Sequence, residues 1–267
     1  MCIISLEFVF GSMVRTQLTL IQIDNYGPWT VTPHPRPEVD LQTLQSRLYA
    51  DLSQLVGRDG GYVFYTRFDN MIAVTNTLDM ADHERIQSSV RNRYPVTISL
   101  TVGVDDRPEG ALAGATKQLQ AAGSAQDGTR TEILGGEVID PTNAGVQIAH
   151  FDVNSATERY TDQLSAFEVY QQINRGYVTL AGHMHDAHGA LTFFVGGDNV
   201  IAVTPDLNQP AFQDAIEHVQ EIADIDLKVG VGEGATATDA GMAAKEALEH
   251  CRETGDNVKL GAEPAAH

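Results

Sequence analysis

Two aspartates flanked by apolar runs have the type and spacing to bind a metal ion. Asp24 ends the apolar run at 18–23, and Asp69 lies in a predicted hairpin at 62–75. If the turn brings Asp69 beside the first strand, the two carboxylates repel each other unless a cation lies between them. Mg²⁺ binds carboxylate and phosphate oxygens together, so the pair predicts one or two Mg²⁺ ions and a triphosphate. For either aspartate alone, the alternative is a turn residue that hydrogen-bonds its own backbone.

The residues after Asp24 add a possible anion site. Asn25, Tyr26 and Gly27 are followed by Pro28, and the segment 25–30 is expected to be a loop. Backbone N–H groups of such a loop can face a phosphate. Asn25, Tyr26 and Gly27 are therefore predicted to bind the substrate.

The chain contains an internal repeat. Residues 68–75 (FDNMIAVT) match 197–204 (GDNVIAVT), and Asp152 and Asp198 repeat the spacing of Asp24 and Asp69 to within one residue. Val-Gly-Val follows in each copy, at 102–104 and 229–231, and an Ala-rich helical segment with a lysine closes each copy. Landmarks that recur in one order predict two homologous domains. We place them at 14–135 and 145–260, because the Gly- and Pro-containing segment 135–145 is typical of a boundary.

The periodicity of each copy predicts an α+β domain. In the first copy we expect a helix at 41–57, a hairpin at 62–75, a helix at 83–93, a strand at 96–104 and a helix at 110–122. With the strand that ends at Asp24, the order is βαββαβ, which is the ferredoxin-like arrangement.

Composition excludes several classes of partner. The 267 residues include 36 acidic and 17 basic side chains, a net charge of −19, which argues against binding nucleic acid or an anionic membrane. No apolar run is long enough to span a bilayer. Two cysteines indicate a reducing, cytoplasmic setting, and the dispersed carboxylates suit a protein of a salt-loving cell. Residues 1–13 lack signal-peptide features and are interpreted as a non-native or mis-started extension.

Longer motifs support a family resemblance. Gly196-Gly-Asp-Asn199 is similar to the start of the hairpin signature of GGDEF domains, which share a palm fold with nucleotidyl cyclases. IQIDNYGPWTVTP (21–33), DLQTLQSRLYADL (40–52), FYTRFDN (64–70), RNRYP (91–95) and GGDN (196–199) together resemble archaeal GTP cyclohydrolase III, from about residue 16 to 255. The resemblance implies tandem palm domains and a homo-oligomer. It also implies Mg²⁺-dependent hydrolysis of GTP to 2-amino-5-formylamino-6-(5-phosphoribosylamino)pyrimidin-4(3H)-one and two phosphates, in archaeal flavin and deazaflavin biosynthesis.

GTP as the substrate calls for phosphate and guanine partners. Arg67 and Lys117 are candidates to neutralise phosphates, and the alternatives are a strand residue paired with a nearby acid for Arg67 and a solvated helix residue for Lys117. Asn25, Asn70 and Gln22 could read the guanine edge, but their spacing selects none of them. Asp152, Asp198, Asn199 and Lys245 form a possible second site. The second domain is a second site, a part of guanine recognition or a degenerate scaffold, and we place the main site in the first domain.

Two alternative functions and a few other residues remain open. Asn70 and Asn199 replace the glutamate of diguanylate cyclases, which disfavours a nucleotidyl cyclase, and the other alternative is a non-catalytic GTP-binding regulator. His183, His185 and His188 have a spacing that can bind zinc, but the first copy has no matching histidines, which favours a solvated helix-end loop. His83 and His150 are candidate proton carriers, and Cys251 is expected to be packed in the core.

Overall fold

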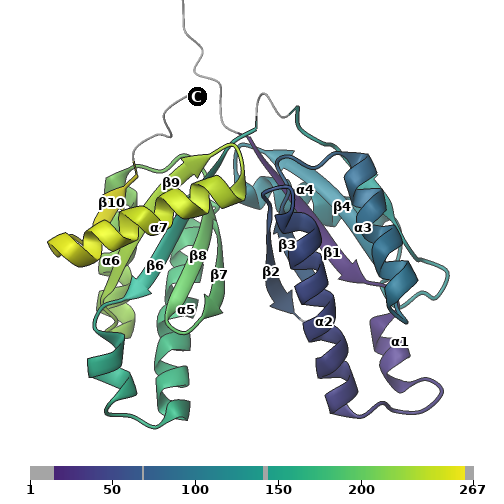
Figure 1. Ribbon diagram of the computed structural model, residues 1–267, viewed down its shortest axis with the longest axis horizontal. Coiled ribbons are helices and arrows are strands. Elements are labelled where there is room, and N and C mark those ends of the chain that lie inside the picture. The colour runs from purple at the N-terminus through teal and green to yellow at the C-terminus, as the bar shows by residue number, and fades with distance from the viewer. Residues whose placement is uncertain (1–14, 68, 141–143, 262–267) are drawn as a thin grey trace, which may run out of the picture.

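The computed structural model describes residues 15–67, 69–140 and 144–261, so the interpreted extension at 1–13 lies outside the described residues. The N-terminal half forms a five-stranded sheet with helices on both faces (Figure 1). In chain order its elements are β1 (Thr16–Ile23), α1 (Tyr26–Val31), α2 (Glu38–Gly57), β2 (Tyr62–Arg67), β3 (Asn70–Val74), α3 (Met80–Arg93), β4 (Ile98–Asp105), α4 (Pro108–Ala121) and β5 (Leu134–Gly136).

The C-terminal half repeats this arrangement beside the first (Figure 1). Its elements are β6 (Val146–Val153), the short π-helix η2 (Thr157–Thr161), α5 (Ala166–His188), β7 (Leu191–Gly196), β8 (Asn199–Thr204), α6 (Gln209–Ala223), β9 (Leu227–Gly234), α7 (Ala237–Thr254) and β10 (Val258–Leu260).

Both sheets have the same topology. The strand orders are β2-β3-β1-β4-β5 and β7-β8-β6-β9-β10, with the first strand of each half in the centre. The first four strands of each half pair antiparallel, and the fifth is added parallel to the fourth. This order confirms the predicted pair of α+β, ferredoxin-like palm domains, each extended by one strand.

Alternation along β1 separates two cores. Ile21 and Ile23 face α2 and α3, and pack with Leu48 and Leu52 of α2. Leu18 points to the opposite face, which α4 covers. Because side chains alternate at every residue, Gln22 and the position of Asp24 fall on the α4 face. The equivalent β6 divides its residues in the same way between α5 and α6 on one side and α7 on the other.

The two domains share the core that lies on their inner faces. Phe64 of β2 stacks on Phe193 of β7 with ring centroids 4.3 Å apart and an interplanar angle of 1°. Backbone hydrogen bonds also cross between the halves: Thr238 N–H donates to Gly60 O at 2.9 Å, and Glu109 N–H donates to Gly189 O at 3.0 Å. The inner faces are thus joined by apolar packing and by the backbone.

Three local expectations are wrong. The segment 25–30 is not a loop, because α1 begins at Tyr26; Pro28 is tolerated there since the first turn of a helix has no intrahelical partner for its N–H groups. The Val-Gly-Val landmarks are not equivalent either. Gly103 pairs with Leu18, six residues before Asp24, whereas Gly230 pairs with His150, two residues before Asp152.

The third wrong expectation is that the segment between the domains begins at 135. Gly135 and Gly136 belong instead to β5 and pair with Thr101 and Val102 of β4. Gly136 has a φ of 120°, and a Cβ there would lie 2.1 Å from Val102 O, so only glycine fits. The connection therefore runs from 137 to 145, of which residues 141–143 lie outside the described ranges.

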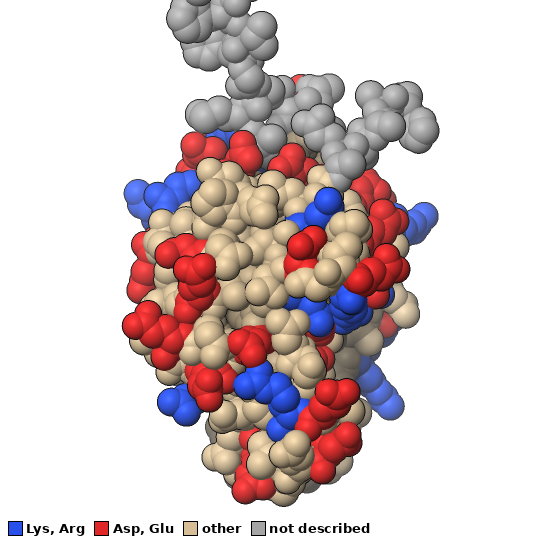
Figure 2. Space-filling model, turned by 90° about the vertical axis from the view of Figure 1, so that its left-hand side faces the viewer, with Lys and Arg blue, Asp and Glu red and all other residues tan. Residues whose placement is uncertain are grey.

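The surface agrees with the composition. Figure 2 shows carboxylates spread over the face of the C-terminal domain and interspersed with basic groups, rather than gathered in one patch. Within the described ranges, no helix has the length and apolar character that crossing a membrane requires.

Candidate active site

The two aspartates of the N-terminal domain lie at the same end of neighbouring strands. In the β1–β3 ladder, Gln22 pairs with Asn70, and the Ile23 N–H donates to Asp69 O at 2.9 Å. Asp24 is the next residue of the chain. The hairpin thus places Asp69 beside the end of β1, so that both aspartates lie at one end of the sheet.

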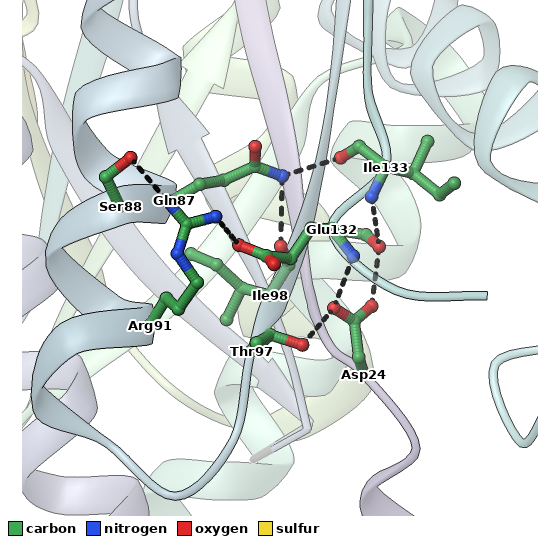
Figure 3. A network of polar contacts seen from close by, with 9 residues as sticks. Asp24, Gln87, Ser88, Arg91, Thr97, Ile98, Glu132 and Ile133 are labelled. Atoms are coloured by element: carbon green, nitrogen blue, oxygen red, sulfur yellow. Dashed lines mark hydrogen bonds and ion pairs between the residues drawn. The ribbon is translucent and has the colours of Figure 1, made fainter. Parts of the chain in front are cut away.

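The Asp24 carboxylate is buried and held by neutral donors (Figure 3). Its Oδ1 accepts a hydrogen bond from Ser99 Oγ at 2.5 Å, and its Oδ2 accepts from Thr97 Oγ1 at 2.7 Å and from Glu132 N–H at 2.8 Å. The side chain is 4% exposed, and no cation pairs with it among the described residues. Hydrogen bonds fix its orientation while its charge stays uncompensated, a combination that suits a metal ligand.

Helix α3 braces the segment that supports Asp24. Glu132 has a φ of 51°, the left-handed region, and its N–H points at Asp24. Its carboxylate accepts from Arg91 Nη1 at 2.7 Å, and Arg91 Nη2 donates to Ser88 Oγ (Figure 3). Gln87 donates to the backbone carbonyls of 98 and 133. Strain at Glu132 persists because these contacts hold both sides of it.

Asn25 provides a second oxygen next to Asp24. It has a φ of 50°, and its N–H donates to Ala125 O at 3.0 Å. Its Oδ1 is buried without a hydrogen-bond partner within the described ranges. A buried amide oxygen left unpaired is costly, and a hard cation is one partner that would satisfy it. The carboxylates of Asp24 and Asp69 and this amide oxygen are the kinds of oxygen ligand that Mg²⁺ prefers, and all three residues lie at the same end of the sheet.

Asp69 and its neighbours are more exposed. Arg67 Nη2 contacts Asp69 Oδ2 at 3.0 Å, and the Arg67 side chain is 73% exposed. Asn70 Oδ1 accepts from Gln22 Nε2 at 2.9 Å. Burial chiefly raises the pKa of the Tyr26 phenol, and the charges of Glu38 and Asp69 add to it, so Asp69 lies within electrostatic reach of α1.

The structure does not bring every predicted substrate residue to this strand end. Gly27 is exposed in the first turn of α1, and Tyr26 accepts a hydrogen bond from Gln45 of α2. Lys117 lies on the exposed side of α4 and lines neither cavity at the site.

Two cavities border the end of β1. One, of about 800 Å³, lies between β1, β3 and α4 and is lined by Gln22, Arg67, Asn70, Thr116, Gln120 and Arg130, among others. The other, of about 330 Å³, is lined by Asp24, Asn25, Trp29, Tyr94 and Thr97. Sequence reasoning did not single out Thr97, Ser99, Arg130 or Glu132, which have no motif of their own.

In the C-terminal domain the equivalent aspartate, Asp152, forms ion pairs with basic side chains. Asp152 is 5% exposed, and its Oδ2 lies 2.9 Å from Arg252 Nη2 and 3.5 Å from Lys228 Nζ. Lys228 is opposite Asp152 in the β6–β9 ladder, where the N-terminal domain has Thr97. Burial and then the charge of Asp152 raise the pKa of Asp198. Protein cations thus neutralise Asp152 without a metal.

Asn199 and Lys245, the other residues of the predicted second site, lie on β8 and α7. His150 Nε2 lies 3.0 Å from Asn199 Oδ1, and burial lowers the pKa of His150. Lys245 is exposed on α7.

The histidines of the second copy lie in a helix and not in a loop. His183, His185 and His188 belong to the last two turns of α5. His218 of α6 stacks on His183 with centroids 4.4 Å apart, whereas His185 approaches Glu109. In the part of the chain that the structure describes, no three His, Cys, Asp or Glu side chains form a metal-binding group, so the zinc alternative has no support.

Comparisons with known proteins identify the family. A family model described as GTP cyclohydrolase III matches residues 16–262. GTP cyclohydrolase III of Natronomonas pharaonis is 62% identical over 251 residues, which cover 93% of this chain and 99% of that protein. The Methanocaldococcus jannaschii protein of the same name is 47% identical over 238 residues, or 88% of each chain.

Solved structures give a weaker likeness. The GGDEF domain of DgcB from Caulobacter crescentus, solved with its coiled coil, is 14% identical, has a TM-score of 0.38 and covers 44% of this chain and 70% of that one. The fold assignment therefore depends on the strand order described above. The sequence relatives, in contrast, span nearly the whole chain, and the protein belongs to the GTP cyclohydrolase III family.

Proposed function

We propose that the protein hydrolyses GTP with Mg²⁺ in its N-terminal domain, opens the imidazole ring and releases two phosphates. The observation that carries this proposal is the placement of Asp24 and Asp69 at one end of adjacent strands, with the unpaired Oδ1 of Asn25 on the residue that follows Asp24. The names of the relatives in the family point to the same substrate.

Each group at the strand end has a distinct part. Asp24, oriented by Thr97, Ser99 and the Glu132 N–H, would hold one or two Mg²⁺ ions together with Asp69. Bound Mg²⁺ would neutralise phosphate charge and make a nearby water more acidic. Asn25 would complete the oxygen donors of the ion.

The basic and amide groups would position the nucleotide. Arg67 is exposed beside Asp69 and would donate to phosphate oxygens. Asn70 and Gln22, already joined by a hydrogen bond, present amide groups to the larger cavity. Lys117 is expected to act only through long-range attraction, because it lines neither cavity.

The C-terminal domain would support the first domain without binding a metal of its own. Its Asp152 is neutralised by Lys228 and Arg252, so the electrostatic reason to bind Mg²⁺ is missing. The predicted second site at Asp152, Asp198, Asn199 and Lys245 is thus proposed to be a degenerate copy.

The proposed setting follows from the family and the charge. We propose a cytoplasmic homo-oligomer in a halophilic archaeon, which supplies the ring-opened nucleotide to flavin and deazaflavin biosynthesis. Relatives from Natronomonas pharaonis and Halobacterium salinarum agree with this setting, as does the charge of −19. Light scattering would test the oligomer by comparing the mass in solution with 28.9 kDa.

Incubation with GTP and Mg²⁺ tests the activity. We expect loss of the purine ultraviolet band, and mass spectrometry should find a ring-opened monophosphate and two phosphates. Asp24→Asn and Asp69→Asn should abolish turnover in folded protein, while Asp162→Asn, on the exposed surface, should not. A cyclic product with pyrophosphate would instead show a cyclase, and Mg²⁺-dependent binding without turnover would show a regulator.

A further inference from the structure

A buried guanidinium in the N-terminal domain lacks most of its hydrogen bonds. Arg130 lies in the segment between α4 and β5 and is 5% exposed. Its Nη1 donates to Gln22 Oε1 at 2.8 Å. Its Nε and Nη2 have no partner among the residues that the structure describes.

Such an arrangement is unfavourable without a ligand. Guanidinium stays charged at any physiological pH, and burying its charge without an opposite charge is strongly destabilising. Native structures satisfy nearly all buried donors, so an exception needs an explanation. Since the described residues supply no partner for Nε and Nη2, a ligand is the explanation that we develop.

The surroundings of Arg130 indicate what that partner is. Arg130 lines the cavity of about 800 Å³, together with apolar side chains such as Leu20 and Ile72 and neutral polar ones. Among the described residues, Arg67 is the other charged member of the lining, and no carboxylate contributes to it. In a protein with a net charge of −19, a cavity whose charged side chains are both arginines is suited to an anion.

The free atoms of Arg130 also have a specific shape. Nε and Nη2 form one side of the planar fork, which binds two oxygens of a phosphate in parallel. Gln22 joins this fork to the metal-site hairpin, since its Oε1 accepts from Arg130 and its Nε2 donates to Asn70. A phosphate held there would lie on the α4 face of β1, the face to which Asp24 is assigned by alternation.

We propose that the cavity between β1, β3 and α4 is a phosphate-binding subsite in which Arg130 donates from Nε and Nη2 to a phosphate group of the nucleotide. The choice of the nucleotide as the source rests on the proposed function, whereas the anion site itself does not. Arg130 would then be a second arginine, besides Arg67, that binds phosphate. It lies 108 residues along the chain from Gln22, which it contacts.

Binding without turnover provides the direct test. Titration calorimetry in EDTA, at one KCl concentration, would compare inorganic triphosphate, inorganic phosphate, GTP and guanosine. We expect triphosphate and GTP to bind, and Arg130→Met and Arg130→Lys to weaken both by about 10- to 100-fold, because the charge-assisted pair is lost in both variants. Arg85→Met, which removes an exposed arginine of α3, should bind as wild type does.

The melting temperature of Arg130→Met provides a second test, because we expect this variant to be more stable than wild type. Replacing an unpaired buried charge with an apolar side chain of similar length should raise the melting temperature of the ligand-free protein by at least about 2 °C. Triphosphate should raise the melting temperature of wild type but not of Arg130→Met. A purely structural arginine would do the opposite, because its loss would lower the melting temperature.

Each outcome decides the proposal. Unchanged triphosphate binding in both Arg130 variants, or a destabilised or unfolded Arg130→Met with normal binding in Arg130→Lys, would overturn it. Arg130-dependent binding of guanosine alone would overturn it in favour of base recognition, and equal binding of inorganic phosphate and GTP would assign the site to free phosphate. If wild type binds triphosphate through Arg130 but does not hydrolyse GTP, the proposed function fails and the subsite stands.

Discussion

Asp24 and Asp152 occupy equivalent positions, and we expect replacement by asparagine to have opposite effects in the two domains. Asp152 faces two cations, whereas Asp24 faces hydroxyl groups and one backbone N–H. Asp152→Asn should therefore reduce stability and leave catalysis intact. Asp24→Asn should leave stability nearly unchanged and abolish catalysis.

The size of the Asp152 effect follows from its partners. Removing one member of a buried ion pair costs about 3–5 kcal/mol, because the other charge stays buried and unpaired. The Lys228 side chain is 14% exposed, but that of Arg252 is 39% exposed, so water can hydrate the released guanidinium. We therefore expect about 3 kcal/mol, the low end of that range, and a melting temperature lowered by about 6–12 °C.

The size of the Asp24 effect is small for stability and large for turnover. Asparagine keeps one oxygen acceptor and removes a buried charge that no cation pairs within the described part of the chain, so the two changes offset each other to about 1 kcal/mol. Loss of residues that only support a metal ligand costs about 10- to 100-fold, so loss of the ligand itself should cost at least about 100-fold in turnover.

Thermal melting by circular dichroism and GTP turnover at saturating Mg²⁺ would be measured on the same samples at fixed KCl. Asp162→Asn serves as the control, since its side chain is exposed and belongs to neither predicted site. Full activity in Asp24→Asn, or loss of activity in Asp152→Asn without a change in melting temperature, would refute the assignment of roles.

Three further outcomes are expected. Arg91→Gln removes the ion pair with Glu132, whose N–H orients Asp24, and should raise the Mg²⁺ concentration for half-maximal activity by about 10-fold with little change in melting temperature. An unchanged Mg²⁺ titration would contradict this supporting role of Arg91. Burial lowers the pKa of His83 from 6.5, so the unfolded chain binds a proton more readily than the folded protein does. The free energy of unfolding, measured with urea, should therefore reach its full value above about pH 6.5 and decrease below it, and the decrease should be less steep in His83→Gln. The same pH dependence in both proteins would exclude His83 as the cause. Trp29, the sole tryptophan, lines the cavity with Asp24, so its fluorescence should change with Mg²⁺ and GTP in wild type and not in Asp24→Asn.

The domain architecture could be predicted because its signals are local and occur twice. Apolar periodicity identifies α2, and the Asp-Asn turns mark both hairpins. Helix α3 begins three residues before its predicted start at 83, because Asp79 and Asp82 form a capping box there that apolar periodicity alone does not indicate. Helix α1 was missed because six residues are too few to show a period.

Strand register was harder to predict than strand existence. The two Val-Gly-Val segments look alike, but register depends on which residues hydrogen-bond across the ladder, and a glycine spacing does not define it. The two Val-Gly-Val segments are therefore not equivalent positions of the repeat, but the repeat itself is confirmed by the strand order.

The supporting residues of the site could not be predicted from local pattern. Arg130 and Glu132 lie in a segment without periodicity, 108 residues along the chain from Gln22 and Asp24, which they contact. Only the three-dimensional fold brings them there. Aspartates at a strand end and a hairpin turn carry a recognisable chemistry, whereas a lone arginine or glutamate in an irregular segment usually lies in solvent.

The contact between the two halves pairs each residue with its own counterpart. Phe64 and Phe193 occupy the same position in β2 and β7, and the bonds from Thr238 to Gly60 and from Glu109 to Gly189 are each other's copies. This reciprocity is the signature of an isologous interface, in which a two-fold axis relates identical patches. One polypeptide therefore preserves the geometry of a symmetric dimer, and covalent linkage has made the pairing independent of protein concentration. Because the linked halves need not be identical, one can carry Lys228 at the position where the other has the hydroxyl of Thr97 and an aspartate without a cation.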